Sequence, residues 1–445
     1  MKTRLMGYKG KKSQDNPEGR RRKPEARALE GIGTMNHESK TRREFLGTMG
    51  HLGAGALLTA TGVESARGFV ANDTVEVACL GTGGRCRTLM NSLAKIPNVR
   101  IAAVCDIYDK HLAEGRKLAD PHAVVSRNYR ELLDRKDIDA VLIGSPDHWH
   151  VPMTIHACQA GKDVYVEKPL THDLSEGKAV IDAQNKNQRI VQVGTQQRSM
   201  PHLQKAKELI QQGRLGKVFK AHLTWNRNQP GRIVRTPLGV NPQEVDWKSF
   251  LGNAPDQSFD EYRFRNWRWF WDFGGGLLTD LMVHWLDVAH WFLDLDHPTQ
   301  ATAIGNHVSS KGGWETPDTI QCLLAYPGDV QIYFEGTFSN ARNAAMAEFM
   351  GTDATLYVDR GRYELHPELN KGKYEELILG TDPHRGRDFY DKPDGELLHL
   401  TNWIECVRSR SRPNSPAETG VGAASAAQLG NQAYRTGQVA TWKAS

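Results

Sequence analysis

Lys168 is the residue whose type and setting point most directly to chemistry. It follows the short run Val164-Tyr165-Val166-Glu167 and precedes Pro169. A β-branched and aromatic run of this length is typical of a buried parallel strand, and proline keeps the residue before it out of the helical region. We therefore expect Lys168 at the carboxyl end of a strand, which is the edge where open α/β sheets bind ligands.

A second group of chemically capable residues follows the glycine run 274–276. Asp280, His284 and Asp287 recur at intervals of four and three residues. On an α-helix these side chains share one face, and a carboxylate one turn before a histidine can orient the imidazole and stabilise its charged form. Such a pair suits a proton relay. A metal site and a purely structural, hydrogen-bonded helix face are the alternatives.

The stretch 75–86 has the form of a nucleotide-binding turn. Residues 75–80 indicate a strand, Gly81-Thr82-Gly83-Gly84-Arg85 a tight turn, and residues 88–95 a helix. Glycines permit such a turn, and the N-terminus of the helix can then face a pyrophosphate. Cys86 stands where the usual motif has a third glycine. Because cysteine is small, close packing of the helix on the strand is still expected.

An acidic residue stands where a bound ribose would need one. A second expected strand, 99–104, leads to Asp106, 25 residues after Gly81. A carboxylate there can accept hydrogen bonds from both ribose hydroxyls and would repel a 2′-phosphate. The sequence therefore predicts NAD, rather than NADP, as the cofactor.

Helices and strands alternate as far as residue 194. Expected helices over 129–133, 152–160 and 175–187 alternate with expected strands over 140–143, 163–166 and 189–193. This order predicts a doubly wound parallel sheet. The loop Pro146-Asp147-His148-Trp149-His150 falls at the carboxyl end of a strand. We expect it to pack beside the nicotinamide or the ribose rather than to bind metal.

The pattern changes after residue 194. Expected strands over 319–325, 330–337 and 345–350 predict an antiparallel sheet, and helices are expected over 398–408 and 419–434. The run 262–272 interleaves aromatic residues with arginines, which suits either packing between domains or a wall on which a sugar stacks. We expect a Rossmann-type domain over 74–194 and an α+β substrate and oligomerisation domain over 195–445.

Length, composition and charge limit the classes of function. The 445 residues, 39% hydrophobic and 24% charged, suggest two or three domains. Residues 1–34 carry ten Lys/Arg against four Asp/Glu, and residues 35–70 carry four against three, so the formal charge of +5 becomes −2 for the remainder. A nucleic-acid partner is not expected. The cysteines contain no C-x-x-C pair and are interpreted as small buried hydrophobic residues.

The N-terminal region suggests export. Residues 1–34 are interpreted as a basic disordered extension, and Met35 is a candidate start. Thr41-Arg42-Arg43-Glu44-Phe45-Leu46, followed by the mild apolar run 47–63, resembles a twin-arginine signal within 35–70. Its glycines, threonines and His51 argue against a stable membrane span. Glu64-Ser65-Ala66 matches a cleavage site poorly, so cleavage and retention both remain open.

Together these motifs carry a family resemblance over residues 74 to about 436. The glycine turn, the strand ending at Asp106, the loop 146–150 and Glu167-Lys168-Pro169 resemble the glucose-fructose oxidoreductase, inositol dehydrogenase and MocA family. The resemblance implies a catalytic Lys168, a matching Asp280 and His284 pair with His284 near the substrate hydroxyl, and a second domain with a large antiparallel sheet that often forms homo-oligomers. The expected cofactor-binding residues are Gly81, Thr82, Gly83, Gly84, Arg85, Asp106, Pro146, His148, Glu167, Lys168 and Gln196.

The sequence thus predicts an exported NAD-dependent oxidoreductase acting on a secondary alcohol of a sugar or polyol. Lys168 would take or share the hydroxyl proton, and His284, oriented by Asp280, would pass it to solvent. No metal is expected, because hydride transfer to NAD needs none. Some secreted relatives are NAD-dependent glycosidases, so an oxidation, elimination and re-reduction cycle on one NAD is an alternative. A non-catalytic sugar-binding protein is a second alternative.

Overall fold

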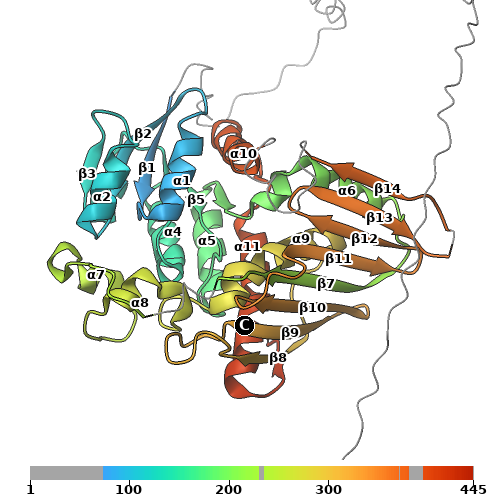
Figure 1. The fold of residues 1–445 in the computed structure, drawn as a ribbon. Helices are drawn as coiled ribbons and strands as arrows, with labels where there is room; N and C mark the ends of the chain where they lie inside the picture. The colour runs from blue at the N-terminus through green and yellow to red at the C-terminus, as the bar shows by residue number, and fades with distance from the viewer. Residues whose placement is uncertain (1–73, 230–234, 370, 380–393, 444–445) are drawn as a thin grey trace, which may run out of the picture. The chain divides into compact units, whose positions relative to one another are not determined.

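A computed structural model describes residues 74–229, 235–369, 371–379 and 394–443. All of them belong to one compact unit, which carries two sheets (Figure 1). The basic extension 1–34, the twin-arginine segment 35–70 and its candidate cleavage site lie outside the described residues. Within the described ranges, no helix is long and apolar enough to cross a membrane.

The first sheet is parallel throughout, as predicted. Over the described residues it has six strands in the order β3-β2-β1-β4-β5-β6. Its strands are β1 (Val75–Leu80), β2 (Val99–Cys105), β3 (Val124–Ser126), β4 (Ala140–Ile143), β5 (Asp163–Val166) and β6 (Val191–Val193). The helices between them are α1 (Gly84–Leu93), α2 (Asp109–Arg116), α3 (Tyr129–Leu133), α4 (His150–Gln159) and α5 (Glu176–Asn187). Since β1 and β4 are neighbours, the strand order reverses beside the glycine turn, where such sheets bind ligands.

The glycine turn depends on close approach between β1 and β4. Gly81 has φ +78°, and a Cβ there would lie 2.8 Å from the backbone nitrogen of Ser145, so only glycine fits without strain. Cys86, in the place of the third glycine, is fully buried. A Cβ on Gly144 would lie 2.7 Å from the Cys86 Cβ. A glycine at the end of β4 therefore provides the room that the larger residue at position 86 needs.

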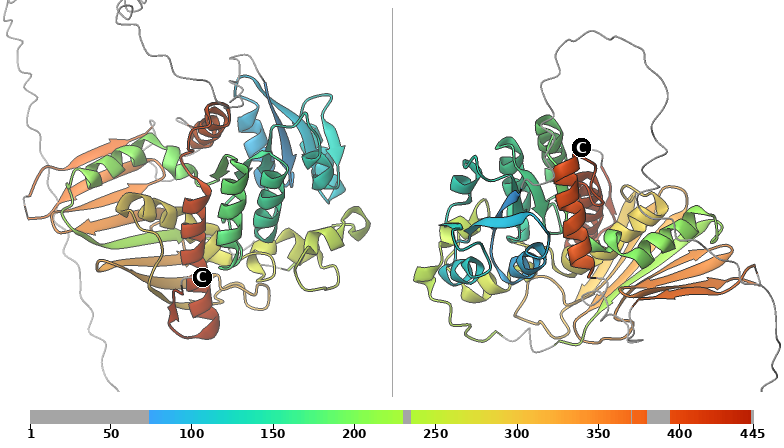
Figure 2. Two further views of the ribbon diagram at one scale, coloured as in Figure 1. Left: turned by 180° about the vertical axis from the view of Figure 1, so that it is seen from behind. Right: turned by 90° about the horizontal axis from the view of Figure 1, so that it is seen from above.

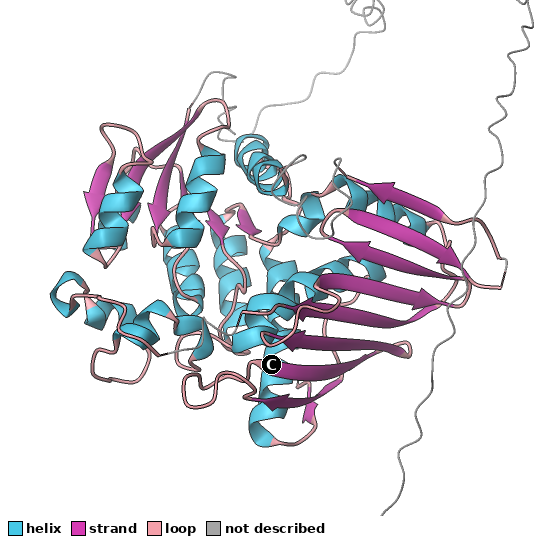
Figure 3. Cartoon of the chain, in the orientation of Figure 1, coloured by secondary structure: helices cyan, strands magenta, loops and turns pink. Residues whose placement is uncertain are grey.

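The second sheet, counted over the described residues, has nine strands in the order β14-β13-β12-β11-β7-β10-β9-β8-β15. They are β7 (Val218–Asn226), β8 (Gln300–Asn306), β9 (Thr319–Tyr326), β10 (Val330–Thr337), β11 (Ala345–Gly351), β12 (Ala354–Asp359), β13 (Arg362–Pro367), β14 (Glu375–Ile378) and β15 (Ala440–Thr441). Figure 3 shows this sheet as the broad magenta array. The sheet is antiparallel as predicted, except that β7 and β10 pair in parallel.

Helices cover one face of the second sheet and join it to the first. The helices after residue 194 are α6 (Pro201–Gln211), α7 (Trp247–Leu251), α8 (Glu261–Arg265), α9 (Val283–Leu293), α10 (Gly395–Ser409) and α11 (Ala417–Thr436). The small-residue helix α11 packs against α9 and β8 of the second sheet and against α5 of the first. Figure 2 shows it standing between the two sheets.

Two segments beyond residue 194 cross the predicted domain boundary. Helix α10 packs on α1, and its Trp403 and Ile404 belong to the same hydrophobic core as β1 and α1. The segment 242–268, which contains α7 and α8, pairs with the Rossmann edge through a bridge between Tyr108 and Val245. The cysteines, all of which fall in described ranges, are buried and unpaired as predicted.

Candidate active site

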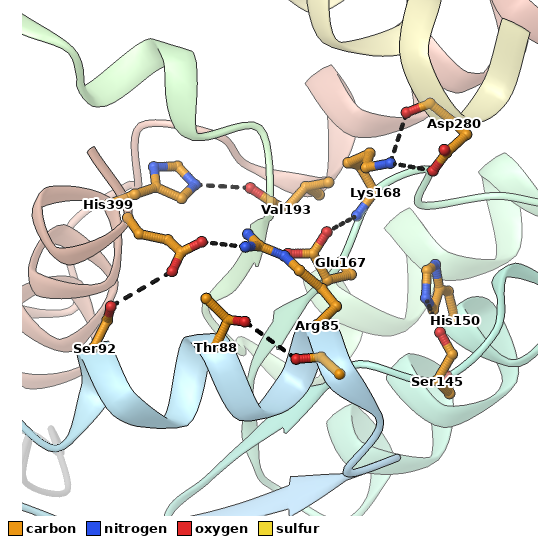
Figure 4. Close-up of polar contacts among 12 residues, drawn as sticks. Arg85, Thr88, Ser92, Ser145, His150, Glu167, Lys168, Val193, Asp280 and His399 are labelled. Atoms are coloured by element: carbon orange, nitrogen blue, oxygen red, sulfur yellow. Dashed lines mark hydrogen bonds and ion pairs between the residues drawn. The ribbon is translucent and has the colours of Figure 1, made fainter. Parts of the chain in front are cut away.

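Lys168 stands immediately beyond β5, where the sequence predicts it. Its Nζ donates hydrogen bonds to the backbone carbonyl and to Oδ1 of Asp280, both at 2.7 Å (Figure 4). The Lys168 side chain is only 11% exposed. The peptide bond between Lys168 and Pro169 is cis. The predicted strand end and the predicted acidic residue therefore meet, although 112 residues separate them.

Asp280 does not orient His284, which corrects the predicted proton relay. Its carboxylate also accepts a hydrogen bond from Arg268 Nε at 3.2 Å, so two cations share it. Burial raises the pKa of Asp280, but the charges of Lys168 and Arg268 outweigh burial and hold this pKa below its usual range. No hydrogen bond joins Asp280 to His284 among the described residues. The nearer cations compete more strongly for the carboxylate than a neutral imidazole does.

His284 is a neutral imidazole against an aromatic wall. Its ring stacks on Trp225 with centroids 5.0 Å apart, and its buried Nδ1 has no hydrogen-bond partner. Burial and the charge of Lys168 lower the pKa of His284 well below the ordinary value of 6.5. At neutral pH the ring therefore retains an unprotonated nitrogen that can accept a proton.

Asp287 does not join the other two predicted side chains of this segment. Leu278–Met282 forms a π-helical turn that continues directly into α9, a distortion that often marks functional sites. Asp287, the third predicted member, is fully buried and accepts hydrogen bonds from Arg198 Nε at 2.8 and 3.0 Å. Asp287 is thus part of a buried ion pair that joins α9 to the segment after β6, and it does not line the site.

Arg85 and Glu167 form a second ion pair beside the lysine. Arg85 Nε donates to Glu167 Oε1 at 2.8 Å, and its Nη1 pairs with Glu396 in the first turn of α10. Burial opposes the charged form of Arg85, but the two carboxylates outweigh it and raise the arginine pKa. The Gln196 amide, oriented to match its partners, donates to the Gly194 carbonyl at 2.9 Å and accepts from Arg85. Glu396 has no local sequence signal that relates it to this site.

The two histidines of the loop after β4, His148 and His150, do not line the cavity at the glycine turn. His148 Nε2 lies 2.8 Å from the Phe250 carbonyl, and its ring packs against Phe250 and Phe273. Burial lowers the pKa of His148 to about 4. His150 lies between the carbonyls of Ser145 and Pro169, at 2.9 and 2.7 Å. His148 therefore holds the segment 242–268 against the first domain through Phe250. The position of His148 in the loop does not predict this contact.

A first cavity of about 680 Å³ opens at the glycine turn and has the features that NAD requires. Gly81, Gly83, Gly84, Asp106 and Pro146 all line it. Asp106 accepts hydrogen bonds from the Tyr108 backbone nitrogen at 2.9 Å and from Thr82 Oγ1 at 3.4 Å, which leaves carboxylate lone pairs for ribose hydroxyls. The N-terminus of α1 offers backbone amides to a pyrophosphate. The residues present therefore fit the dinucleotide.

A second cavity, also of about 680 Å³, contains the candidate catalytic groups. Lys168, Asp280 and His284 line it together with the aromatic side chains of Trp225, Trp269 and Phe338. Gly84, Arg85, Arg265 and Arg268 line both cavities. In the aromatic and arginine run 262–272, Tyr262 and Phe264 belong to the hydrophobic core, which agrees with the packing interpretation. Trp269 lines the second cavity, and its role as a wall for a sugar stays a prediction. Within the described residues, no cluster of three His, Cys, Asp or Glu side chains could hold a metal ion.

Two protein-family models match this chain, one over the first domain and one over part of the second. Residues 75–195 match the model described as an oxidoreductase family with an NAD-binding Rossmann fold. Residues 203–357 match the model of the GFO/IDH/MocA C-terminal domain.

Individual relatives match over shorter stretches. The uncharacterized oxidoreductase YrbE of Bacillus subtilis is 31% identical over 165 residues, which cover 36% of this chain and 48% of YrbE. The alpha-N-acetylgalactosaminidase of Shewanella oneidensis is 32% identical over 125 residues, 26% of this chain and 27% of that protein. The scyllo-inositol 2-dehydrogenase (NAD(+)) of Bacillus subtilis is 26% identical over 295 residues, 64% of this chain and 71% of the dehydrogenase. The first two matches therefore span about half or less of the relative's length.

The same fold occurs in solved structures. Levoglucosan dehydrogenase, in complex with NADH and levoglucosan, superposes with a TM-score of 0.66 at 16% identity, over 83% of this chain and 99% of that one. At this identity the likeness establishes the fold alone.

Proposed function

Because the chain belongs to the GFO/IDH/MocA oxidoreductase family, we propose that it is an NAD-dependent oxidoreductase that acts on a secondary alcohol of a sugar or polyol. One observation carries the proposal. Lys168 and His284 line a cavity that shares Gly84 and Arg85 with the cavity that fits the dinucleotide. A sugar carbon in the second cavity would therefore lie beside both the proton-handling groups and the cofactor.

The chain's own residues suggest how the reaction is supported. NAD, when bound, supplies the acceptor for the hydride that leaves the substrate carbon. Lys168 is paired with Asp280 as an ammonium and can stabilise negative charge that develops on the substrate oxygen. His284, which is neutral, can take the hydroxyl proton. This assignment differs from the one expected from the sequence, in which Lys168 takes the hydroxyl proton and His284 passes it to solvent. Here His284 takes the proton, because Lys168 is already paired with Asp280.

Glu167 and Arg85 have positioning roles in this proposal. Glu167 holds Arg85 at the start of α1 and directly precedes Lys168, so the ion pair fixes the strand end that carries the lysine. Asp106 would bind the adenosine ribose, and Gly81, Thr82, Gly83 and Gly84 would form the pyrophosphate turn. Pro146 and Gln196 would bound the nicotinamide end.

The proposal is tested by incubating the full chain with NAD and a panel of sugars and polyols. NADH absorbance and the carbonyl product are followed together. A keto product with at least one substrate, absent in Lys168→Met, is the expected result. Protein that binds NAD but oxidises no member of the panel, at any substrate concentration up to saturation, would contradict it.

A closed-cycle glycosidase is the second candidate, and the matches to glycosyl hydrolase family 109 proteins favour it. Such an enzyme would oxidise one sugar carbon, eliminate the aglycone and re-reduce the ring on the same NAD. The product distinguishes the two, because hydrolysis of an aryl glycoside without net NADH would support the glycosidase. Sugar binding with no conversion at all would support the third alternative, a non-catalytic sugar-binding protein.

Export by the twin-arginine route and assembly into a homo-oligomer complete the proposal. The motif at 41–46 supports export, and a folded protein exported in this way can carry a cofactor that it acquired in the cytoplasm. An alkaline phosphatase or fluorescent fusion to residues 1–73, compared with the same fusion carrying Arg42→Lys and Arg43→Lys, tests the route. Equal export of both fusions would contradict it.

A further inference from the structure

Two glutamines follow β6 in the short helical turn Gln196–Ser199, and the protein satisfies only the first of them. The Gln196 amide pairs with the Gly194 carbonyl and with Arg85. The Gln197 side chain is only 2% exposed, yet its amide makes no hydrogen bond to any described residue, and its Oε1 is buried. Burying an amide without a partner costs free energy, so Gln197 lowers the stability of the fold as it stands.

Gln197 lies in the wall of the second cavity, together with Lys168, Asp280 and His284. It does not line the first cavity, where the dinucleotide fits. A ligand that pairs with the Gln197 amide therefore belongs to the second cavity. A hydroxyl group both donates and accepts hydrogen bonds, so it can pair with the amide in either of its two orientations. A hydroxyl of a sugar or polyol is thus a suitable partner.

The residue after Gln197 fixes this turn to α9. Arg198 Nε donates to the two carboxylate oxygens of Asp287 at 3.0 and 2.8 Å, and Nη2 donates to the Asp287 backbone carbonyl at 3.4 Å. Arg198 is 6% exposed and Asp287 is fully buried, so little water competes for these contacts. His284 lies three residues before Asp287 on α9. The buried ion pair therefore holds Gln197 and His284 at fixed positions in the wall of one cavity.

A substrate that contacts both side chains is bound through two of its hydroxyls. One hydroxyl faces His284 and loses its proton, and the other pairs with Gln197. A substrate that binds in a rotated orientation, or that lacks the second hydroxyl, would leave the buried amide unpaired again. Sites built to hydrogen-bond a hydroxyl reject analogues without it far more strongly than apolar pockets reject a missing methylene. The unpaired amide can therefore decide which carbon of the substrate lies beside His284.

We infer that Gln197 binds a second hydroxyl of the substrate, distinct from the hydroxyl that is oxidised, and thereby selects the carbon that is oxidised. The inference rests on the proposed function, because it names a specificity-determining residue of the same site. The substrate is accordingly a polyhydroxylated compound in which one hydroxyl besides the reacting one is required.

Deoxy analogues of the substrate test this role. The parent compound is the sugar or polyol that the wild-type protein oxidises fastest, and each monodeoxy analogue lacks one hydroxyl other than the oxidised one. We expect one analogue to have a kcat/KM at least about tenfold below that of the parent, and Gln197→Met to lower kcat/KM for the parent by a similar factor. In Gln197→Met the same analogue should show no further loss, because both changes remove one hydrogen bond. If Gln197→Met lowers kcat/KM for the parent and every analogue by the same factor, or changes none of them, the inference is wrong and the proposed function stands.

Thermal unfolding separates this role from a structural one. Methionine is unbranched, is nearly as long as glutamine and needs no hydrogen-bond partner, so Gln197→Met should melt at or above the wild-type temperature. The matched control is Gln184→Met, because Gln184 is also buried, donates to Glu418 Oε1 at 3.0 Å and lines neither cavity. Gln184→Met should melt at a lower temperature and keep the wild-type discrimination among the analogues. A lowered melting temperature in Gln197→Met, with discrimination unchanged, would contradict the inference.

A binding measurement distinguishes failure of this inference from failure of the proposed function. Each sugar and polyol of the panel is titrated calorimetrically into NAD-loaded Lys168→Met protein, which needs no turnover, and into the same protein carrying Gln197→Met. Binding that Gln197→Met weakens about tenfold or more, when wild-type protein oxidises no member of the panel, would sustain the Gln197 contact and overturn the oxidoreductase proposal. Equal binding by both proteins of a compound that wild-type protein oxidises would do the reverse.

Discussion

The Nζ atom of Lys168 lies 2.7 Å from both the backbone carbonyl and Oδ1 of Asp280, which joins the end of β5 to the π-helical turn before α9. This pair connects the first sheet to the helix that packs on the second sheet, in the lining of the second cavity. It also fixes the direction of the lysine, because two acceptors on one residue define where Nζ lies.

Replacing Lys168 should abolish turnover and leave the cofactor bound. Lys168→Met removes the ammonium that faces the substrate oxygen, so we expect kcat to fall at least about a hundredfold, the range typical of a positioned proton-transfer or charge-stabilising group. NAD released from denatured protein measures the bound cofactor. Lys178→Met is the control, because Lys178 is an exposed helix residue paired with Asp182. Turnover close to wild type in Lys168→Met would exclude the lysine from the mechanism.

His284 should control the acid side of the pH profile. Burial and Lys168, with Arg360 and Arg85, lower its pKa, while Asp280 opposes them. A base acts in its deprotonated form, so kcat/KM should persist as the pH falls through 6.5 and decline only at lower pH. His284→Asn should lower kcat/KM about 10²- to 10⁴-fold and remove this decline. If the decline of kcat/KM at low pH is unchanged in His284→Asn, another group causes it.

Buried His399 should make the protein less stable in acid. Its Nε2 donates to the Val193 carbonyl at 2.9 Å (Figure 4). Its Nδ1 accepts from Ser199, and burial lowers its pKa to about 4. The unfolded histidine takes up a proton near pH 6.5, so the free energy of unfolding falls as pH drops from about 6.5 to about 4. With about 1.36 kcal/mol per pKa unit, the loss is on the order of 3 kcal/mol. Denaturant unfolding measures the free energy of unfolding across this pH range. This free energy should fall less steeply with decreasing pH in His399→Gln than in wild type, whereas the exposed control His122→Gln should match wild type.

The open face of the second sheet should form a subunit interface. Strand register aligns Thr302, Leu323, Tyr333 and His222 across it, and Leu323 is 40% exposed while Ile304 beside this row is 74% exposed. Sedimentation at micromolar concentration should therefore give a homo-oligomer, and Leu323→Glu should shift it to monomer. Val439→Glu, at an exposed apolar position outside this row, is the control. A monomeric wild-type protein would contradict the prediction.

Local patterns predicted much of the site. The glycine turn, Asp106 and the position of Lys168 depend on neighbours within a few residues, where sequence period and proline geometry are informative. The parallel sheet followed from the alternation of helices and strands. The two family-model matches agree with the predicted family.

Long-range electrostatic pairs could not be predicted in the same way. Glu396 lies 311 residues from Arg85, and no sequence period relates them. The expected Asp280 and His284 pair assumed α-helical spacing and ignored competition, whereas Lys168 and Arg268 take the carboxylate. The π-helical turn and the parallel pairing of β7 with β10 depend on tertiary packing, which local propensity does not encode.

The segment 242–268 should make NAD difficult to release. It lies against the first cavity through Asp246, Phe264 and Arg265, and it is fixed by Asp246 N to the Ile107 carbonyl at 2.9 Å. The Phe250 carbonyl also accepts a hydrogen bond from Trp149 Nε1 at 2.9 Å and lies 2.8 Å from His148 Nε2. Under the proposed export, little free NAD would be available for exchange, so a Kd near 1 nM, about −12.3 kcal/mol, would suit the protein.

Release of cofactor from dialysed protein measures this retention directly. We expect protein purified and dialysed without added NAD to release about one NAD(H) per chain on denaturation, and to turn over without added cofactor when a second substrate regenerates it. His148→Phe keeps an aromatic ring but loses the contact with the Phe250 carbonyl, so NAD should dissociate about tenfold faster. His122→Phe, at an exposed position away from the cavity, should match wild type. Cofactor-free dialysed protein that forms one NADH per product would show an ordinary dissociating dehydrogenase, and the retention hypothesis would then be wrong.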